Sequence, residues 1–242
     1  SLHKNKPNKY SRVHTLKGSE YDNFYAKYAR DLDSNWMRNI QRFTSLKLKK
    51  SSKILDIGCG FGLFSQIATV NDHDVVSIDM PNASPILKEA AKILKIKKYD
   101  FEVKKKSPFL KFEHKFDVVT ALQIFFNGHC TKDLWDVDDW KYFLMDLHDN
   151  ILNDGGSVVL GFNMEHNNLK PIEIDGEVVA LGKKSLEVFF EPFFIKLPNM
   201  PASANKVTAI LTKDSIKKAC ETNIFLKRSF TINTSKTGKY GS

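Results

Sequence analysis

The feature that most constrains the fold is a short apolar segment that runs directly into a series of spaced glycines. Residues 54–57 (ILDI) predict a buried strand, residues 58–62 (GCGFG) a tight turn, and residues 63–70 a helix. Glycine lets a backbone turn sharply and approach a ligand closely. The start of the following helix also favours negative or hydrogen-bond-accepting groups. This order of elements predicts a ligand-binding turn at the carboxyl end of a parallel strand.

The same alternation of strand and helix continues along the chain. Apolar runs predict further strands at 74–79, near 99–104, at 116–122 and at 157–163, and amphipathic helices lie between them, one opened by Ser84 as N-cap and Pro85 at the first helical position. Short buried strands that alternate with helices are typical of a parallel sheet covered on both faces. The sequence therefore predicts an α/β fold with a doubly wound, mostly parallel sheet.

The layout around this core is predicted from composition and period. Residues 1–18 form a flexible basic arm, and 19–50 form an N-terminal helical cap. The cofactor-binding core spans 51–163, and 164–211 is an insertion that serves as a substrate lid and contains a hairpin through 172–179 with an Asp-Gly turn. Residues 212–242 supply a closing helix, a closing strand at 225–232 and a frayed tail.

Composition excludes several classes of protein. With 42% apolar and 27% charged residues in 242, the chain can bury one large core. The three cysteines lie far apart and match neither a disulfide framework nor a zinc-site spacing. No apolar run is long enough to span a membrane, and no secretory signal is present, so we expect a cytoplasmic setting. The net charge of +9 favours an anionic partner.

Spacing separates two classes of nucleoside cofactor. The strand at 74–79 ends in Asp79, where a carboxylate can accept hydrogen bonds from both ribose hydroxyls. A dinucleotide site has the pattern G-x-G-x-x-G, whereas here the third glycine comes one residue early. Asp56, two residues before the first glycine, would repel a pyrophosphate but suits a cofactor with a cationic amino group. Hydride transfer from a dinucleotide is therefore the weaker hypothesis.

Four ordered motifs resemble those of the Rossmann-like (class I) S-adenosylmethionine-dependent methyltransferases. They are ILDIGCGFG, VVSID, FDVVTALQ and ILNDGGSVVL, and together they cover about residues 53–163. The resemblance implies a seven-stranded sheet with its last strand antiparallel, S-adenosylmethionine as cofactor, S-adenosylhomocysteine as product, and no metal. It also implies the following cofactor-binding residues: Asp56, Gly58, Cys59, Gly60, Phe61 and Gly62 around the methionine part, Asp79 and Met80 at the ribose, Ala121, Leu122 and Gln123 along the cofactor, and Tyr25, with Tyr21 and Tyr28 as alternatives, over the methionyl end.

One contact of that family has no clear counterpart. Relatives carry an acidic residue after the third strand that binds the adenine amino group, whereas residues 102–108 read EVKKKSP. Either Glu102 serves, or backbone and apolar contacts hold the adenine.

The loop after the fourth strand faces the transferred methyl group in this family. Here it contains Asn127, His129 and Cys130. A hydroxyl acceptor needs a general base, and His129 is the main candidate, with Asn127 to orient the substrate. The alternative is that His129 is an ordinary surface histidine. His148 and His166 are lesser candidates, and Cys130 is expected to be inert.

The acceptor is predicted mainly by what the sequence lacks. Enzymes of this fold that methylate amino groups of DNA, RNA and some proteins carry D/N-P-P-Y/F after the fourth strand, where this chain has Ala121-Leu122-Gln123-Ile124. We therefore expect O-methylation of a small molecule, such as a sugar, nucleotide-linked or phosphorylated metabolite. Nucleic acid is not favoured, because the lysine runs lack interleaved aromatic residues. An RNA or protein methyltransferase and a non-catalytic S-adenosylmethionine-binding module remain the alternatives. The sequence carries no signal for an oligomeric state.

Overall fold

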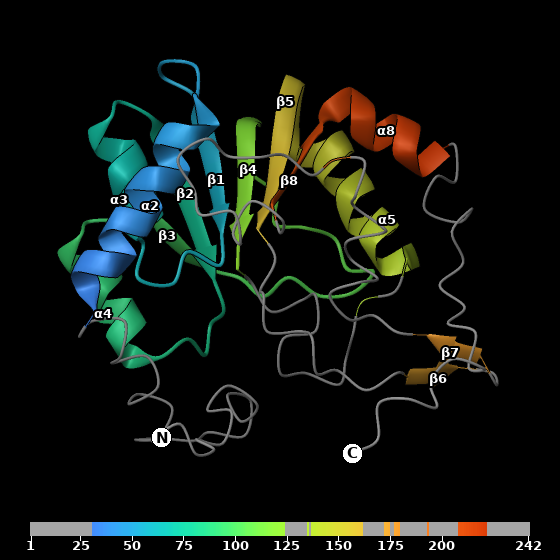
Figure 1. Ribbon diagram of the computed structural model, residues 1–242, viewed down its shortest axis with the longest axis horizontal. Coiled ribbons are helices and arrows are strands. Elements are labelled where there is room, and N and C mark those ends of the chain that lie inside the picture. The colour runs from blue at the N-terminus through green and yellow to red at the C-terminus, as the bar shows by residue number, and fades with distance from the viewer. Residues whose placement is uncertain are drawn as a thin grey trace, which may run out of the picture.

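The computed structural model describes residues 31–123, 135, 137–161, 172–174, 177–179, 193 and 208–221. Within them, six strands form one sheet and two more form a separate pair (Figure 1). The strands are β1 (Lys53–Ile57), β2 (Asp74–Asp79), β3 (Lys98–Asp100), β4 (Phe116–Leu122), β5 (Leu152–Gly161), β6 (Ile172–Ile174), β7 (Glu177–Val179) and β8 (Thr208–Thr212). The helices are α2 (Leu32–Leu46), α3 (Leu63–Val70), α4 (Pro85–Ile93), α5 (Val137–Asp146), the π-helical turn η2 (Leu147–Ile151) and α8 (Lys213–Glu221).

The large sheet has the strand order β3-β2-β1-β4-β5-β8. The first five strands pair in parallel, and β8 runs antiparallel to β5. This confirms the predicted mostly parallel α/β fold. The closing strand predicted at 225–232 lies outside the described residues.

The antiparallel strand of the described sheet lies where the sequence analysis placed the end of the insertion. Residues 208–211 were counted with the lid, but they belong to β8 and pair with β5 from Thr208 to Thr212. Five residues of mixed polarity between longer irregular segments carry too little period to be recognised as a strand. The hairpin predicted through 172–179 is confirmed, because β6 and β7 pair antiparallel.

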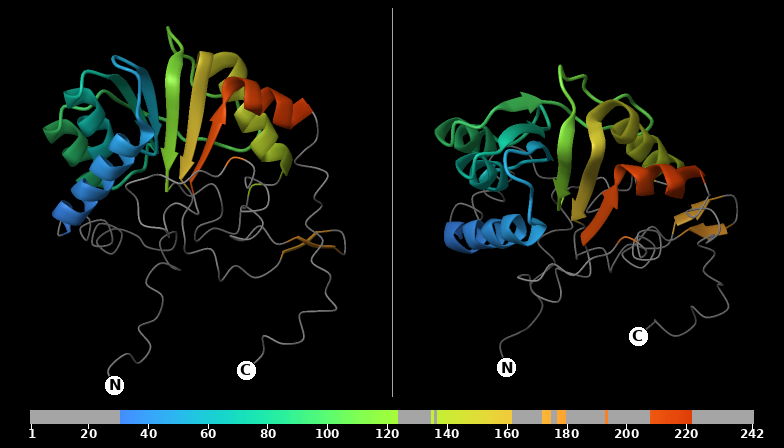
Figure 2. Two further views of the ribbon diagram at one scale, coloured as in Figure 1. Left: turned by 45° about the horizontal axis from the view of Figure 1, so that its top comes forward. Right: turned by 90° about the horizontal axis from the view of Figure 1, so that it is seen from above.

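Alternating side chains build a separate core on each face of the sheet. In β1, Ile54 packs on the face of α2 and α3 with Phe43 and Phe64. Leu55 and Ile57 point the other way into the cluster that includes residues of α5, η2 and α8. Figure 2 shows the sheet between these two groups of helices. The strands are therefore buried on both faces, which explains their continuous apolar character.

Several element boundaries differ from the predicted ones. In the predicted N-terminal helical cap, the described helix spans Leu32–Leu46, and the third strand is only Lys98–Asp100. The helix predicted between the fourth and fifth strands becomes π-helical from Leu147. The predicted N-cap Ser84 and the Pro85 that follows it do open α4. No helix of the described residues is long and apolar enough to cross a membrane.

The carboxyl ends of the parallel strands meet at one edge of the sheet, at the bottom of Figure 1. The strand order reverses between β1 and β4, because the chain first builds outward to β3 and then returns to the other side of β1. Ligands of open α/β sheets bind at such a switch point. The turn that follows β1 lies there.

Candidate cofactor site at the carboxyl edge

The glycine turn after β1 owes its shape to three left-handed residues. Gly58, Gly60 and Gly62 have φ values of 68°, 55° and 74°, a region that side chains disfavour. The N–H groups of Gly58 and Cys59 both donate to the Ile78 carbonyl of β2, at 2.8 and 3.1 Å. The turn is therefore attached to the end of the neighbouring strand.

Asp79, the last residue of β2, binds the same turn through its side chain. Its Oδ2 accepts the N–H of Gly60 at 2.9 Å, and its Oδ1 accepts the N–H of Met80 at 2.9 Å. Two backbone donors thus fix the carboxylate, and each oxygen has further lone pairs for another donor. A group fixed in this way can accept hydrogen bonds from the two neighbouring hydroxyls of a ribose.

These bonds also distinguish between the two cofactor classes. A dinucleotide turn presents its N–H groups to a pyrophosphate. Here the N–H groups of Gly58, Cys59 and Gly60 already bind the end of β2. These three N–H groups are therefore not available to a phosphate, and two buried carboxylates, Asp56 and Asp79, lie next to the turn. This arrangement suits a cationic cofactor rather than a polyphosphate.

The glycines differ in the space around them. A Cβ built on Gly60 meets nothing within 4 Å, so room for a ligand remains beside the turn. A Cβ built on Gly62 falls 1.9 Å from the Cδ1 of Ile96. Gly60 is therefore needed only for its positive φ, whereas Gly62 is needed both for its positive φ and for its close contact with Ile96. The residues present fit an S-adenosylmethionine-like cofactor with its ribose at Asp79.

Asp56 belongs to a buried polar row that the sequence analysis did not foresee. In the sheet register it pairs with Ser77 of β2 and Thr120 of β4. Its Oδ1 accepts the Thr120 hydroxyl at 2.7 Å, and its Oδ2 accepts the hydroxyl of Ser65 in α3 at 2.6 Å. Ser77 in turn donates to Ser65 at 2.8 Å. The period-two pattern of the three strands, read together, was the signal that could have revealed this row.

Burial controls the ionisation of both aspartates. Asp56 is 3% exposed, and desolvation raises its pKa to about 6, against the opposing bonds from Ser65 and Thr120. Asp79 is 8% exposed, and desolvation raises its pKa as well, opposed by the Met80 bond and then by the Lys98 ammonium. The two carboxylates thus lie at the edge of a low-dielectric region. A cationic ligand beside them would favour their charged forms.

Cys59 lies within the turn as a thiol rather than a reactive thiolate. Burial, and then the charges of Asp79 and Asp56, raise its pKa well above the usual range. This environment favours a structural role for the side chain.

A second link at this edge involves Arg42 of α2, which the sequence analysis did not single out. Its Nη2 donates to the Oε1 of Gln123 at 2.5 Å. Gln123 directly follows β4 in a left-handed conformation, with φ of 59°. No pattern in the sequence points to this contact, which joins residues 81 positions apart.

The other predicted cofactor residues within the described part of the chain fall at the same edge. Phe61 and Met80 are half-buried, Ala121 is buried and Leu122 is half-buried. Tyr25, Asn127 and His129 lie outside the described residues, as do Tyr21, Tyr28, Cys130 and His166. Their predicted roles stay predictions.

One lesser candidate does not join the site. His148 lies in η2, which leads into the amino end of β5, and its Nδ1 is 2.6 Å from the Oδ1 of Asp149. It is therefore at the opposite edge of the sheet. Glu102, the alternative for the adenine contact, follows β3 and pairs with Lys104 at 3.4 Å, and its role stays a prediction. Over the described ranges, no group of three or more His, Cys, Asp or Glu side chains could hold a metal ion.

Comparison with known proteins identifies the class. A family model described as a methyltransferase domain matches residues 28–160, more than half of the chain. The chain belongs to this family, and it is a class I S-adenosylmethionine-dependent methyltransferase. No curated protein matches the sequence.

Solved structures with a similar fold share little sequence with the chain. A TehB-like S-adenosylmethionine-dependent methyltransferase from Corynebacterium glutamicum is 22% identical over 61% of this chain and 76% of its own, with a TM-score of 0.45. DesVI from Streptomyces venezuelae is 15% identical over 67% and 68%, with a TM-score of 0.47. A putative O-methyltransferase from Nostoc punctiforme is 18% identical over 60% and 43%, with a TM-score of 0.41.

Proposed function

We propose that the enzyme methylates a hydroxyl oxygen of a small anionic acceptor, such as a sugar, nucleotide-linked or phosphorylated metabolite. The observation that carries the proposal is the end of β4, which reads Ala121-Leu122-Gln123. Enzymes of this fold that methylate amino groups of DNA, RNA and some proteins carry a D/N-P-P-Y/F tetrapeptide at this place. Its absence here disfavours methylation of a nucleobase amine and so favours an oxygen acceptor.

The cofactor roles follow from the chemistry of the described side chains. Asp79, fixed by Gly60 and Met80, is assigned to the ribose hydroxyls. Asp56 and the glycine turn are assigned to the methionine part, and Ala121, Leu122 and Gln123 to the side of the cofactor that faces the acceptor. Asp56 would act through its charge, because hydroxyl groups already bind both of its oxygens.

The reaction needs a base for the acceptor hydroxyl. S-adenosylmethionine, when bound, supplies a methyl group on a positively charged sulfur. The acceptor oxygen forms a bond to the methyl carbon as the carbon–sulfur bond breaks, the sulfur keeps the electron pair, and the hydroxyl proton passes to the base. We assign the base to His129, the orientation of the acceptor to Asn127, and a cover over the methionyl end to Tyr25. These three roles rest on the sequence.

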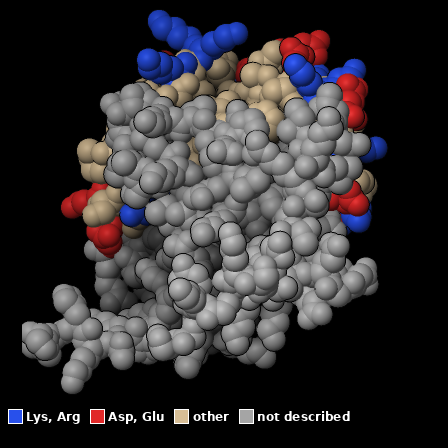
Figure 3. All heavy atoms as spheres, turned by 45° about the vertical axis from the view of Figure 1, so that its right-hand side comes forward, with Lys and Arg blue, Asp and Glu red and all other residues tan. Residues whose placement is uncertain are grey.

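The distribution of charge supports a small acceptor over nucleic acid. The chain carries a net charge of +9. On the face shown in Figure 3, basic and acidic side chains of the described residues lie beside one another at the right, and a group of basic side chains lies at the upper left. Within the described part of the chain, ion pairs also join Lys88 to Asp100, Lys105 to Asp139 and Lys213 to Asp154. A surface of paired charges offers weaker attraction to a polyanion than an uninterrupted basic stripe.

Transfer of an isotopically labelled methyl group tests the proposal. The enzyme, labelled S-adenosylmethionine and a cell extract are incubated together, and the small molecules, RNA and protein are then separated. We expect the label in the small-molecule fraction, with the NMR shift of a methyl ether or ester. Label in RNA or protein would overturn the proposal, and so would cofactor binding with no transfer into any fraction.

The assignment of the base is tested separately. With the labelled product as readout, His129→Ala should lower turnover by about a hundredfold or more, in line with general-base catalysis. His148→Ala is the matched control, because His148 lies at the opposite edge of the sheet and should leave turnover unchanged. Equal rates for the two variants would show that His129 is a surface residue.

A further inference from the structure

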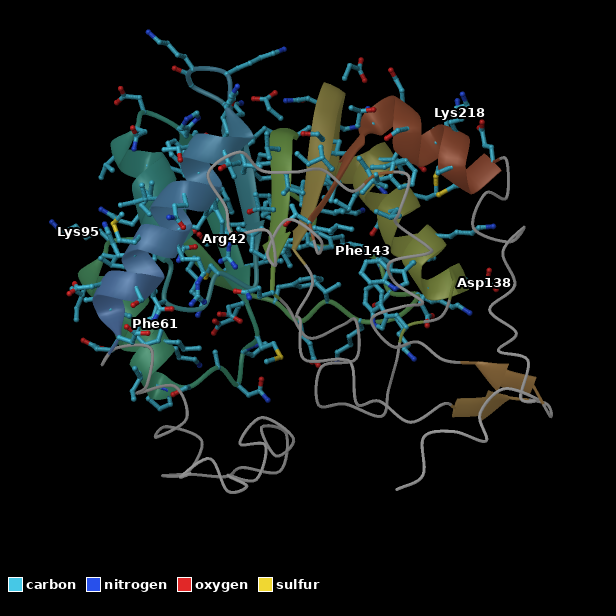
Figure 4. All side chains as sticks on the ribbon, in the orientation of Figure 1. Arg42, Phe61, Lys95, Asp138, Phe143 and Lys218 are labelled. Carbon is cyan, nitrogen blue, oxygen red and sulfur yellow. The ribbon has the colours of Figure 1, made fainter. Side chains whose placement is uncertain are left out.

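Arg42 connects the cap helix to the edge of the sheet where the chemistry takes place. It lies on α2, and its guanidinium donates through Nη2 to the Gln123 side chain at the end of β4, 2.5 Å away. Figure 4 shows Arg42 extending from α2 toward the lower part of β1 and β4. A second, longer bond from Nη1 to Asn39 Oδ1, at 3.4 Å, lies within the same helix. The position of the cation is therefore defined by both α2 and β4.

The acceptor of this bond is itself held in an unusual backbone conformation. Gln123 has a φ of 59°, which costs about 1 kcal/mol or more for a residue with a side chain. Its N–H donates to the Gly161 carbonyl of β5 at 2.6 Å. This bond holds the turn at the end of β4, so the carboxamide is directed to one place. A strained polar residue at a ligand-binding edge is often kept for its function.

The field of Arg42 reaches the polar row below the edge. The guanidinium is among the charges that lower the pKa of Asp56, whereas Asp79 raises it. Its bond to Gln123 places Arg42 at the same carboxyl edge of β4. The two buried carboxylates favour a cation at this edge, and the guanidinium favours an anion.

We propose that the Arg42 guanidinium, oriented by Gln123, is an oxyanion-binding site that takes a carboxylate or phosphate group beside the transferred methyl. A guanidinium is a planar fork whose N–H groups match two oxygens of such a group. The group comes either from the amino-acid part of the cofactor or from the acceptor. The first source would make Arg42 a cofactor residue, and the second would select anionic acceptors and so rest on the proposed function.

Calorimetry with S-adenosylhomocysteine tests the first source. If the cofactor supplies the carboxylate, Arg42→Gln weakens this ligand about tenfold or more. S-adenosyl-3-thiopropylamine, which lacks the carboxylate, then binds wild type and variant equally. Arg38→Gln is the matched control, because Arg38 is an exposed arginine on the same helix. Binding of S-adenosylhomocysteine to the wild type also shows whether the cofactor site functions, independently of Arg42.

Inorganic phosphate tests the second source. If the acceptor supplies the anion, S-adenosylhomocysteine binds both proteins equally. Phosphate then binds the wild type loaded with S-adenosylhomocysteine at millimolar concentration and fails to bind Arg42→Gln under the same conditions. The proposal is overturned if both ligands bind the wild type and Arg42→Gln within twofold of each other.

Two further variants separate the anion site from a structural role of Arg42. Arg42→Lys keeps the charge but loses the fork, so it should recover only part of the lost affinity. Gln123→Glu keeps Arg42 but places a carboxylate against it, and it should weaken the same ligand as Arg42→Gln. Thermal melting of each variant checks its folding. If Arg42→Gln and Gln123→Glu lower the melting temperature equally and leave ligand affinity unchanged, Arg42 only attaches α2 to the sheet and the proposal is wrong.

Discussion

Toward their carboxyl ends, the central strands bury different kinds of surface on their two faces. On the face toward α5 and α8, Leu55, Ile57 and Ile78 belong to a continuous apolar cluster. On the face toward α3, the carboxyl halves of the same strands bury the polar row of Ser77, Asp56 and Thr120. The hydroxyls of Thr120 and of Ser65 in α3 donate to the Asp56 carboxylate, and the hydroxyl of Ser77 donates to Ser65. One face is thus built to hold the sheet together, and the other is adapted at its edge to hold a ligand.

The difference shows how a fold accommodates a polar site. Buried apolar side chains contribute roughly 25 cal/mol for each Å² removed from water. A buried carboxylate opposes folding unless donors satisfy it, and here side-chain hydroxyls supply those donors. The polar row is therefore tolerated because the opposite face, with its aromatic residues of α5, supplies stability without interruption.

The largest expected effect comes from weakening the apolar face. Leu144 of α5 is fully buried in the cluster, so Leu144→Ala should lower the free energy of unfolding by about 2–5 kcal/mol. The affinity of the folded protein for S-adenosylhomocysteine should not change. Urea denaturation measures the first quantity and calorimetry the second. Ile93→Ala, at an exposed helical position, is the control and should be nearly neutral. If Leu144→Ala lowers the affinity but not the stability, the apolar face does not have the purely stabilising role assigned to it.

The buried carboxylates of Asp56 and Asp79 should make the free energy of unfolding depend on pH. The folded-state pKa of Asp56 is about 6, above its ordinary value, so the folded protein binds the extra proton between about pH 4 and 6. Asp56 therefore disfavours folding as pH rises through this window, by up to about 3 kcal/mol at roughly 1.4 kcal/mol per pKa unit. Asp79 adds to this trend, since its pKa is also raised.

Urea denaturation between pH 4 and 7.5 measures this contribution as the difference between wild type and Asp56→Asn. We expect the unfolding free energy of the wild type to fall with rising pH relative to that of the variant. If the two curves are parallel, folding does not raise the pKa of Asp56.

The sequence was sufficient for the fold because the strands are buried on both faces. Runs such as 74–79 and 116–122 are continuous in apolar character, and both strands have the predicted boundaries. The short strand Thr208–Thr212 was missed because it owes its conformation to pairing with β5 rather than to its own pattern. The π-helical end of the long helix was likewise not encoded in the spacing of its apolar residues.

The site was predictable only where it is local in sequence. The glycine turn and Asp79 lie next to strand ends, so their position followed from the motif. The partners of Asp56 come from β4 and α3, and Arg42 reaches Gln123 from 81 residues away. Contacts across this distance depend on the register of strands and on the packing of the cap helix, which one sequence does not specify.

A smaller effect is expected for the contribution of Asp79 to ligand binding. Asp79→Asn replaces the oxygen that accepts the Met80 or Gly60 N–H with a donor, and it removes the charge. We expect affinity for S-adenosylhomocysteine to fall about 10- to 100-fold, in line with hydrogen bonds to a charged group. The control is Asp100→Asn, because Asp100 is the register partner of Asp79 but is exposed. Equal losses in the two variants would point to a general charge effect instead of a ribose contact.

The smallest effects separate the ligand side of the glycine turn from its packing side. Both Gly60→Ala and Gly62→Ala place a side chain at positive φ, which costs about 1–2 kcal/mol of stability. Gly62→Ala should cost more, because its Cβ meets the end of Ile96, whereas the Cβ of Gly60 enters open space.

Adding Ile96→Ala tests this cause, since it removes the atom that the new Cβ meets. The double variant Gly62→Ala/Ile96→Ala should lose less unfolding free energy than the sum of the losses in the two single variants. Gly60→Ala, by contrast, should couple to binding of S-adenosylhomocysteine and not to Ile96. If Ile96→Ala changes the stability of both glycine variants by the same amount, the clash is not what distinguishes them. Gly60 and Gly62 would then have the same role in the turn. The boundary between residues that bind the ligand and residues that stabilise the fold would lie at Asp56, within the sheet.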